Sequence, residues 1–207
     1  MRILHIGKYY WPIPGGIETA ARDIAVEQIR QGHSVWVLAH QKQCGLAASL
    51  ETCEGVTIHR IPIWGHVAYA PIAPSFPRTF RKVLSNFQPQ VIHVHMPNLS
   101  PLWLGMQRNE GPLVIHWHSD VYTSLKSFSI GLLYFGYALF QKRLLQKAKA
   151  IVATSGFYQR TSKPLQAFSR KTVSLPLALD PGRLNAGHKM QHAGPQRPFV
   201  LSAGRFT

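Results

Sequence analysis

Two histidine pairs are the groups in this 207-residue chain whose type and spacing best suit chemistry. His93 and His95 end one β-branched run, and His116 and His118 end another, which Asp120 follows closely. Because side chains alternate along a strand, the two members of a pair share one face of the sheet. Imidazole and carboxylate groups are common zinc ligands, so a metal site is one interpretation. The other buries His93 and His116 in the core and leaves His118 and Asp120, furthest along the strand, as the predicted catalytic residues.

A glycine pair stands directly before the first predicted helix. Residues 3–6 are typical of a buried strand, and the loop after them ends in Gly15 and Gly16. Glycines at a helix N-terminus leave backbone N–H groups and the positive end of the helix dipole exposed, an arrangement that suits a phosphate. The spacing is not G-x-G-x-x-G, so an ordinary NAD-binding fold is not indicated. A turn without a ligand is the plain alternative.

The elements that must position these groups alternate along the chain. Strands are predicted at residues 3–6, 34–39, 56–60, 90–95, 112–117, 148–153 and 172–175, and helices at 16–30 and from 75 onward. Strands separated by helices favour an α/β fold, in which a parallel sheet carries helices on both faces. Ligands of such sheets gather at the carboxyl ends of the strands, where the histidine pairs and the glycine loop lie.

The end of the chain has a different composition. Residues 182–198 contain Gly, Pro, His and Gln with few apolar side chains, as in a linker. A fresh apolar run follows at 199–203 and ends in Gly204 and Arg205. We therefore expect three parts: a domain at 1–181, a linker at 182–198, and at 199–207 the first strand of a second, truncated domain.

The charge of the chain indicates an anionic partner. Lys and Arg number 23 against 8 Asp and Glu, which gives a net charge of +15 and a pI near 10.4. The predicted helix after Ser75 carries Arg78, Arg81 and Lys82 on one face and apolar residues on the other, and Trp64 lies just upstream. An aromatic loop beside a basic amphipathic helix suits an anionic membrane surface. A packed surface helix with solvated charges is the alternative.

Cysteine content and hydropathy suggest the compartment. Cys44 and Cys53 are the two cysteines, which fits a reducing cytosol. The N-terminus runs straight into a strand and soon meets two prolines, unlike a signal peptide. The longest apolar stretch, residues 127–140, is shorter than the ~20 residues that span a bilayer. We therefore expect a cytoplasmic protein, peripheral on the inner face of the plasma membrane.

The ordered motifs of the chain resemble those of a known enzyme family. PIPGGIE, HVHMP, HWHSD, AIVATSGFY, LPLALD and LSAGRF occur in the same order in family 4 glycosyltransferases, which are retaining enzymes of the GT-B fold. The resemblance implies a Rossmann-like parallel sheet with helices on both faces, forming the N-terminal, acceptor-binding half of a GT-B fold. In the turn LPLALD, Ala178 replaces the glycine that is usual in the family.

The same resemblance implies roles for particular residues. His118 would contact the donor sugar or the reacting centre, and Asp120 would orient it or the acceptor. The predicted donor-phosphate contacts are Gly15, Gly16, Gly204 and Arg205. The predicted acceptor contacts are Tyr9, Trp11, His95 and Ser155, and the predicted membrane contacts are Trp64, Arg78, Arg81 and Lys82.

The implied reaction moves a sugar from a nucleotide sugar to an acceptor hydroxyl, with retention of configuration. We expect the acceptor to be a lipid-linked or cell-surface glycan in bacterial polysaccharide biosynthesis. No D-x-D element is present, so no metal and no cofactor besides the nucleotide-sugar co-substrate is expected, and no nucleic-acid partner. The family's lysine after Arg205 and its E-x7-E element are not in these residues, so we expect the chain alone to be inactive.

Three other functions stay open at this point. A sugar-nucleotide epimerase shares the GT-B fold. A non-catalytic module that binds anionic membranes or nucleic acid would suit the basic charge, although no nucleic-acid recognition motif is evident. A metal-dependent hydrolase could use the four histidines and Asp120 as ligands.

Overall fold

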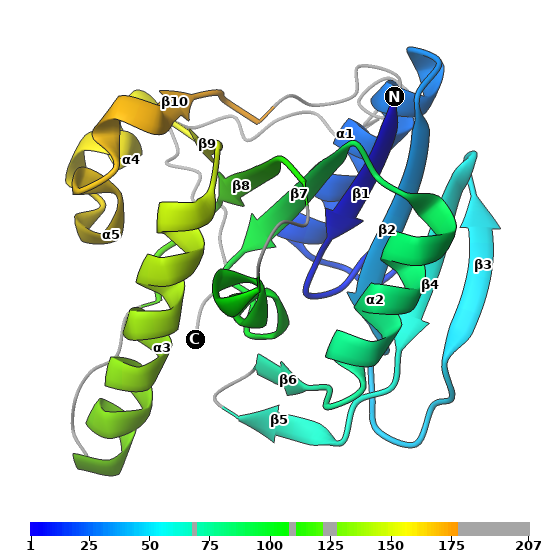
Figure 1. The fold of residues 1–207 in the computed structure, drawn as a ribbon, viewed down its shortest axis with the longest axis horizontal. Helices are drawn as coiled ribbons and strands as arrows, with labels where there is room; N and C mark the ends of the chain where they lie inside the picture. Colours follow the sequence, from blue (N-terminus) through cyan, green and yellow to red (C-terminus); the bar gives the residue numbers. More distant parts are fainter. Residues whose placement is uncertain (68–69, 108–110, 122–127, 178–207) are drawn as a thin grey trace, which may run out of the picture.

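The protein is described by a computed structural model that covers residues 1–67, 70–107, 111–121 and 128–177. Eight strands form one sheet in the order β10-β9-β8-β7-β1-β2-β4-β3, shown in Figure 1. Seven of them are parallel: β1 (Arg2–Ile6), β2 (Ser34–His40), β4 (Val56–Ile61), β7 (Val91–Met96), β8 (Leu113–Trp117), β9 (Ala150–Ala153) and β10 (Thr172–Ser174). Each corresponds to a predicted strand, and the α/β parallel fold class is confirmed.

Three strands were not predicted from the sequence. The edge strand β3 (Ser49–Cys53) pairs antiparallel with β4, and its residues are largely exposed, so it lacks the apolar pattern of a buried strand. The strands β5 (Gly65–Val67) and β6 (Ala70–Ile72) form a separate hairpin of three residues each. The predicted linker at 182–198 and the strand at 199–207, with Gly204 and Arg205, lie outside the described residues.

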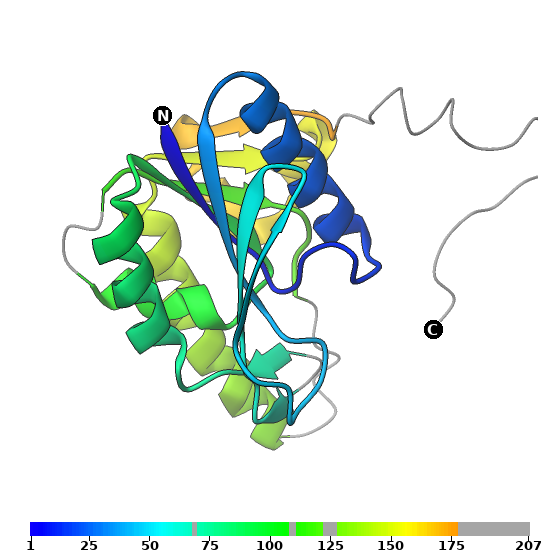
Figure 2. The ribbon, with the colours of Figure 1, turned by 90° about the vertical axis from the view of Figure 1, so that its right-hand side faces the viewer.

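Helices cover both faces of the sheet, as Figure 2 shows. The helix α1 (Gly16–Arg30) packs on one face, and α2 (Phe76–Phe87), η1 (Ser100–Met106) and α3 (Phe128–Lys147) pack on the other. The short elements α4 (Gly156–Thr161), α5 (Lys163–Gln166) and η2 (Ser169–Lys171) connect β9 to β10. The predicted helices at 16–30 and after Ser75 are therefore confirmed.

The two faces of the central strands differ in chemistry. On the side of α2 and α3, the main core takes alternate residues of β1 and β7, among them Leu4, Ile6, Ile92 and Val94. Because side chains alternate, the residues between them face α1. On β7 these intervening residues include His93 and His95, so the α1 face carries imidazoles where the opposite face is apolar.

The order of the strands reverses at the centre of the sheet. From β1 the chain proceeds through β2 to β4 on one side, then returns to β7 on the other side of β1 and continues outward to β10. In parallel sheets a ligand crevice forms at such a reversal, beyond the carboxyl ends of the strands. The ends of β1, β7 and β8 are therefore where a site is expected.

Candidate functional site

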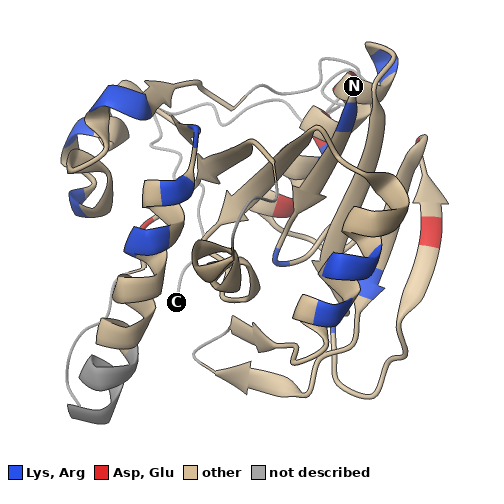
Figure 3. Ribbon diagram, in the orientation of Figure 1, with Lys and Arg blue, Asp and Glu red and all other residues tan. Residues whose placement is uncertain are grey.

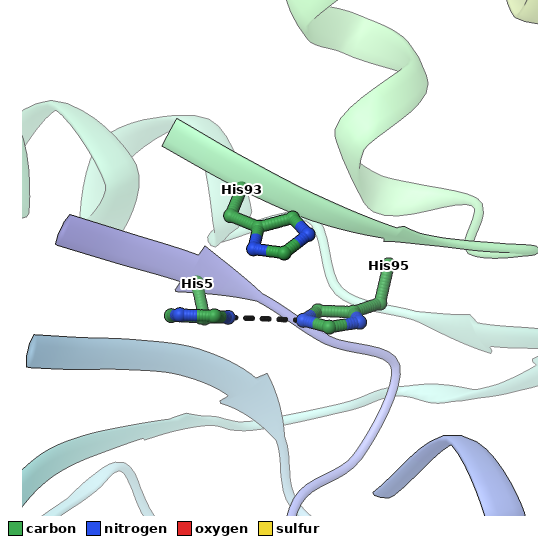
Figure 4. A group of neighbouring side chains, drawn as sticks. All are labelled: His5, His93 and His95. Atoms are coloured by element: carbon green, nitrogen blue, oxygen red, sulfur yellow. Dashed lines mark hydrogen bonds between the residues drawn. The ribbon is translucent and has the colours of Figure 1, made fainter. Parts of the chain in front are cut away.

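Five histidines from three neighbouring strands form a continuous layer on the α1 face of the sheet. Register pairs His5 of β1 with His93 of β7, and His95 of β7 with His116 of β8. The ring centroids of His116 and His118 are 4.3 Å apart, and the planes of His93 and His116 differ by only 4°. Figure 4 shows three of these rings side by side. We call His5, His93, His95, His116 and His118 the histidine layer.

A chain of hydrogen bonds runs through this layer from α1 to the end of β8. The Oε1 atom of Gln28 lies 2.7 Å from Nε2 of His5. The Nδ1 atom of His5 lies 3.0 Å from Nε2 of His95, the bond drawn in Figure 4, and Nδ1 of His95 lies 3.0 Å from Nε2 of His118. The chain thus connects a helix residue to the histidine predicted to be catalytic.

Sequence reasoning missed His5 and Gln28. His5 lies in the middle of the first predicted strand, so the alternation used for His93 and His95 could have placed it on the same face. Gln28 is part of an ordinary amphipathic helix, and its type and spacing give no sign of a partner 23 residues earlier. The structure adds both residues to the site.

Burial keeps the histidine layer uncharged at neutral pH. Loss of hydration lowers the pKa of His5 and His116 to about 4 and that of His118 to about 3. It also holds the pKa of His93 and His95 well below the usual 6.5, and repulsion between neighbouring imidazolium charges acts in the same direction. Neutral imidazoles each carry one N–H donor and one bare nitrogen, as a hydrogen-bond chain requires.

The histidine layer also contains two groups whose nitrogens could meet at a metal. The ring nitrogens of His5, His93 and His95 lie within 4.8 Å of one another, and so do those of His95, His116 and His118. In the second group, Nδ1 of His95 and Nε2 of His118 form a hydrogen-bonded pair at 3.0 Å, which accounts for their close approach without a metal ion. His116 makes no hydrogen bond through either ring nitrogen within the described residues. The absence of a metal stays a prediction.

Asp120 is held on the other side of β8 from the histidine layer. Its Oδ1 atom accepts hydrogen bonds from Trp117 Nε1 at 2.8 Å, from Tyr158 Oη at 2.8 Å and from Ser162 Oγ at 2.7 Å. These donors fasten α4 and α5 to the end of β8. The catalytic role of Asp120 stays a prediction, to which the structure adds this structural role. Ser155, predicted to contact the acceptor, caps α4 by accepting from the backbone N–H of Tyr158.

The loop after β1 brings two of the predicted acceptor contacts to the surface of the crevice. The hydroxyl of Tyr9 lies 2.8 Å from Nε2 of His66 in the β5–β6 hairpin. The ring of Trp11 is 37% exposed, and the guanidinium of Arg22 lies over it at 4.8 Å. Exposed aromatic rings of this kind can stack on a sugar or lipid headgroup.

Arg60 holds this loop against the sheet. It is almost fully buried in β4, and its Nη1 and Nη2 atoms donate to the backbone carbonyls of Tyr10 and Trp11 at 3.2 and 2.6 Å. Its Nε atom donates to Glu51 of β3 at 2.6 Å. A planar guanidinium can reach all three acceptors at once, so this side chain fixes the part of the loop that contains Tyr10 and Trp11.

The predicted phosphate site at the glycine pair already has an anion beside it. Gly15 precedes the first turn of α1, and a Cβ atom there would overlap the carboxylate of Glu18, which is buried. A carboxylate in this place stabilises the positive end of the helix dipole. Gly16 has open space around it, whereas a phosphate could approach Gly15 only if the Glu18 side chain turned away. Phosphate binding at Gly15 and Gly16 stays a prediction.

The predicted membrane contacts lie on the surface. Trp64 is 79% exposed, and Arg78, Arg81 and Lys82 are exposed on α2. The guanidinium of Arg81 lies over the ring of Trp103 at 5.1 Å. Figure 3 shows that basic residues also occur on α3 and α4, with few acidic residues between them. None of the helices in the described residues is both long and apolar enough to cross a membrane.

Comparison with known protein families identifies the family to which the chain belongs. A family model described as a glycosyl transferase 4-like domain matches residues 15–178. The chain belongs to this family, and its sheet is the N-terminal half of a GT-B fold, which confirms the resemblance seen in the motifs.

Two curated relatives are similar in sequence to most or all of this chain. The chain is 27% identical over 208 residues to a phosphatidyl-myo-inositol mannosyltransferase of Mycobacterium tuberculosis, covering 100% of this chain and 52% of the relative. It is 26% identical over 199 residues to O-antigen chain mannosyltransferase C of Escherichia coli, covering 93% and 48%. The chain thus spans about half the length of these relatives.

The solved structures share the fold at low sequence identity. The catalytic domain of starch synthase IV from Arabidopsis thaliana, bound to ADP and acarbose, matches with a TM-score of 0.62 at 14% identity, over 91% of this chain and 54% of that one. Sucrose-phosphate synthase from Thermosynechococcus elongatus matches with a TM-score of 0.59 at 16% identity, over 84% and 47%.

Replacing Arg60 by lysine should loosen the loop after β1. Lysine keeps the charge but has one nitrogen in place of three, so R60K should lower the free energy of unfolding by about 1–3 kcal/mol. Urea denaturation measures this. As a control, R30K changes an exposed arginine paired with Glu27 at 3.6 Å and should cost less than about 0.5 kcal/mol. Equal effects of the two variants would contradict the role of Arg60.

The histidine layer should make the fold sensitive to acid. Because the pKa of these residues is lower in the folded state, their contribution to stability is complete above pH ~6.5 and is lost as the pH falls toward ~4. Each proton taken up on unfolding removes about 1.4 kcal/mol per pH unit. Urea unfolding between neutral and acid pH should show this slope.

Replacing His116 by leucine tests how one histidine of the layer contributes to the loss of stability in acid. Both ring nitrogens of His116 lack a hydrogen-bond partner within the described residues, so H116L should fold at neutral pH and lose less stability in acid, by about one proton. H33Q, outside the layer, is the control. A stability that did not change between these pH values would refute the buried, neutral layer.

Proposed function

We propose that this chain is the acceptor-binding half of a bacterial hexosyltransferase that moves mannose from a nucleotide donor to a lipid-linked or cell-surface glycan acceptor. The observation that carries the proposal is the alignment of nearly the whole chain with two mannosyltransferases whose named acceptors differ, a phosphatidylinositol and an O-antigen chain. The donor sugar is what the two names share. The reaction belongs to a protein that joins these residues to a donor-binding domain, and the 207 residues alone should not transfer sugar.

The site offers groups that suit such a transfer. Loss of a nucleoside diphosphate leaves negative charge, which oriented N–H groups and cations stabilise. The backbone N–H groups at Gly15 and Gly16 are proposed for this task once the Glu18 carboxylate turns away from Gly15, with Gly204 and Arg205 as further phosphate contacts. His118, at the end of β8 beside the strand-order reversal, would contact the donor sugar or the acceptor hydroxyl. Tyr9, Trp11, His95 and Ser155 complete the proposed acceptor contacts.

The proposed reaction retains configuration and uses no metal. The hydrogen bonds of His95 with His5 and His118 support the absence of a metal, because they account for both ring nitrogens of His95 without a metal ion. Cytoplasmic location follows from the donor, since nucleotide sugars are made there, and no nucleic-acid partner is proposed.

The basic face of α2 suits binding of the protein to a membrane surface. A lipid-linked acceptor must be reached at a membrane surface, and Arg78, Arg81 and Lys82 project from one helix that follows the β5–β6 hairpin in Figure 1. The apolar face of α2 packs into the core through Phe76, Phe80 and other side chains. The helix can therefore contribute to membrane binding only through its charges. We propose peripheral binding to anionic lipid by this face, with Trp64 inserting beside it.

Replacing His118 should abolish transfer. In the full-length protein, H118A should lower kcat by about a hundredfold or more, because it removes a group at the reacting centre. The measurement is transfer of radiolabelled mannose from GDP-mannose to extracted bacterial lipid, with UDP-glucose and ADP-glucose as alternative donors. H33Q is the control and should keep full activity. Absence of transfer from every donor would contradict the proposed function, and so would a hydrolase activity that requires zinc.

Neutralising α2 should weaken membrane binding. The triple variant R78Q/R81Q/K82Q should bind vesicles of anionic lipid about a hundredfold more weakly, from about 1 kcal/mol per basic residue. Co-sedimentation with vesicles measures the effect. The matched control R160Q/K163Q/R170Q removes the same charge from exposed positions on α4, α5 and η2. Equal loss in both variants would show that net charge alone, and not α2, attracts the protein to the membrane.

A further inference from the structure

The hydrogen-bond chain through the histidine layer has a direction that its first member sets. Gln28 approaches His5 with its carbonyl oxygen, which can only accept, so Nε2 of His5 carries the proton. A neutral imidazole has one N–H, and Nδ1 of His5 is therefore bare and accepts from Nε2–H of His95. The same step repeats, so Nδ1 of His95 accepts from Nε2–H of His118.

The hydrogen-bond chain ends at an atom of His118 that has no hydrogen-bond partner within the described residues. Once Nε2 of His118 donates to His95, its Nδ1 atom carries the lone pair. This nitrogen is buried and makes no hydrogen bond within the described part of the chain. A buried acceptor left unsatisfied costs about 1–3 kcal/mol, so an O–H or N–H donor of a ligand is favoured at this nitrogen once the atoms that cover it move aside. Sugar and inositol hydroxyls are such donors.

We propose that Gln28, His5 and His95 are positioning residues that hold His118 as the Nε2–H tautomer, so that Nδ1 accepts a hydrogen bond from a hydroxyl of the substrate. This inference rests on the proposed function for the identity of the ligand, but the tautomer itself follows from the geometry. The packing agrees with it, because the rings of His5, His95 and His118 differ in plane by about 20° and their linked nitrogens lie 3.0 Å apart.

Burial helps to keep the hydrogen bonds between the histidine rings in one direction. A proton added to His5 or His95 would turn the bare Nδ1 atom into a donor and break the bond to the next ring, and a proton added to His118 would leave its Nδ1 atom unable to accept. Loss of hydration opposes that step in His5, His95 and His118 alike. The polarity of the chain is therefore decided by the amide of Gln28, which is its one member that is not an imidazole.

The tautomer can be measured directly. In protein labelled with ¹⁵N-histidine, the shifts of the two ring nitrogens separate a protonated from a bare nitrogen. We expect His118 to show a protonated Nε2 and a bare Nδ1. Q28M keeps the length of the side chain but removes the acceptor, so His118 should become a mixture of both tautomers. Q28E restores an acceptor and, at mildly alkaline pH, should restore the single tautomer. Q31M, on the exposed side of the same helix, is the matched control and should change nothing.

Activity then tests whether the tautomer matters. In the full-length protein, Q28M should lower kcat about 10- to 100-fold with little change in KM for the donor, and Q28E should recover most of the loss. A protonated Nδ1 on His118, or a tautomer that Q28M leaves unchanged, would overturn the inference even if transfer proceeds normally. A tautomer shift in Q28M without loss of kcat would overturn the positioning role. If the wild-type protein transfers no sugar, the proposed function fails, and the spectrum alone decides the tautomer.

Discussion

Neutrality of five closely packed imidazoles, four of them buried, is the constraint on which the rest of this structure depends. Strand register brings His5, His93, His95, His116 and His118 together beneath α1, where hydration is lost. Five positive charges could not occupy this space, so the rings stay neutral, and His5, His95 and His118 act as hydrogen-bond donors and acceptors toward one another.

The two faces of the sheet differ in the side chains that they bury. The face under α2 and α3 is a conventional apolar core, in which Phe80 and Trp117 are almost completely buried. The α1 face has a smaller apolar cluster, which includes Ala25, Val37 and Ile58, and carries the histidine layer beside it at the strand-order reversal. Single side chains then secure the surrounding loops: Arg60 holds the loop after β1, and Asp120 ties α4 and α5 to β8. A rigid sheet can thus present several loops to a ligand.

The sequence allowed the sheet, α1 and α2 to be predicted, because buried parallel strands are β-branched runs and α2 has a clear apolar face. The edge strand β3 could not be predicted, since its exposed residues carry no pattern. The pairs at His93 and His116 were visible through alternation, whereas the bonds of His118 to His95 and of His5 to Gln28 join residues 23 positions apart and depend on register and helix rotation. The crowding of Glu18 against Gly15 is likewise a matter of side-chain placement, which motif spacing does not encode.

The most direct test of the account is a crystal structure of the full-length protein with a nucleotide-mannose donor analogue and a soluble acceptor headgroup. The account predicts that both ligands lie beyond the carboxyl ends of β1, β7 and β8, with a ligand hydroxyl within about 3 Å of His118 Nδ1. The rings of His5, His95 and His118 should remain hydrogen-bonded to one another. Ligands bound elsewhere on the domain, or a metal ion held between His95, His116 and His118, would contradict it.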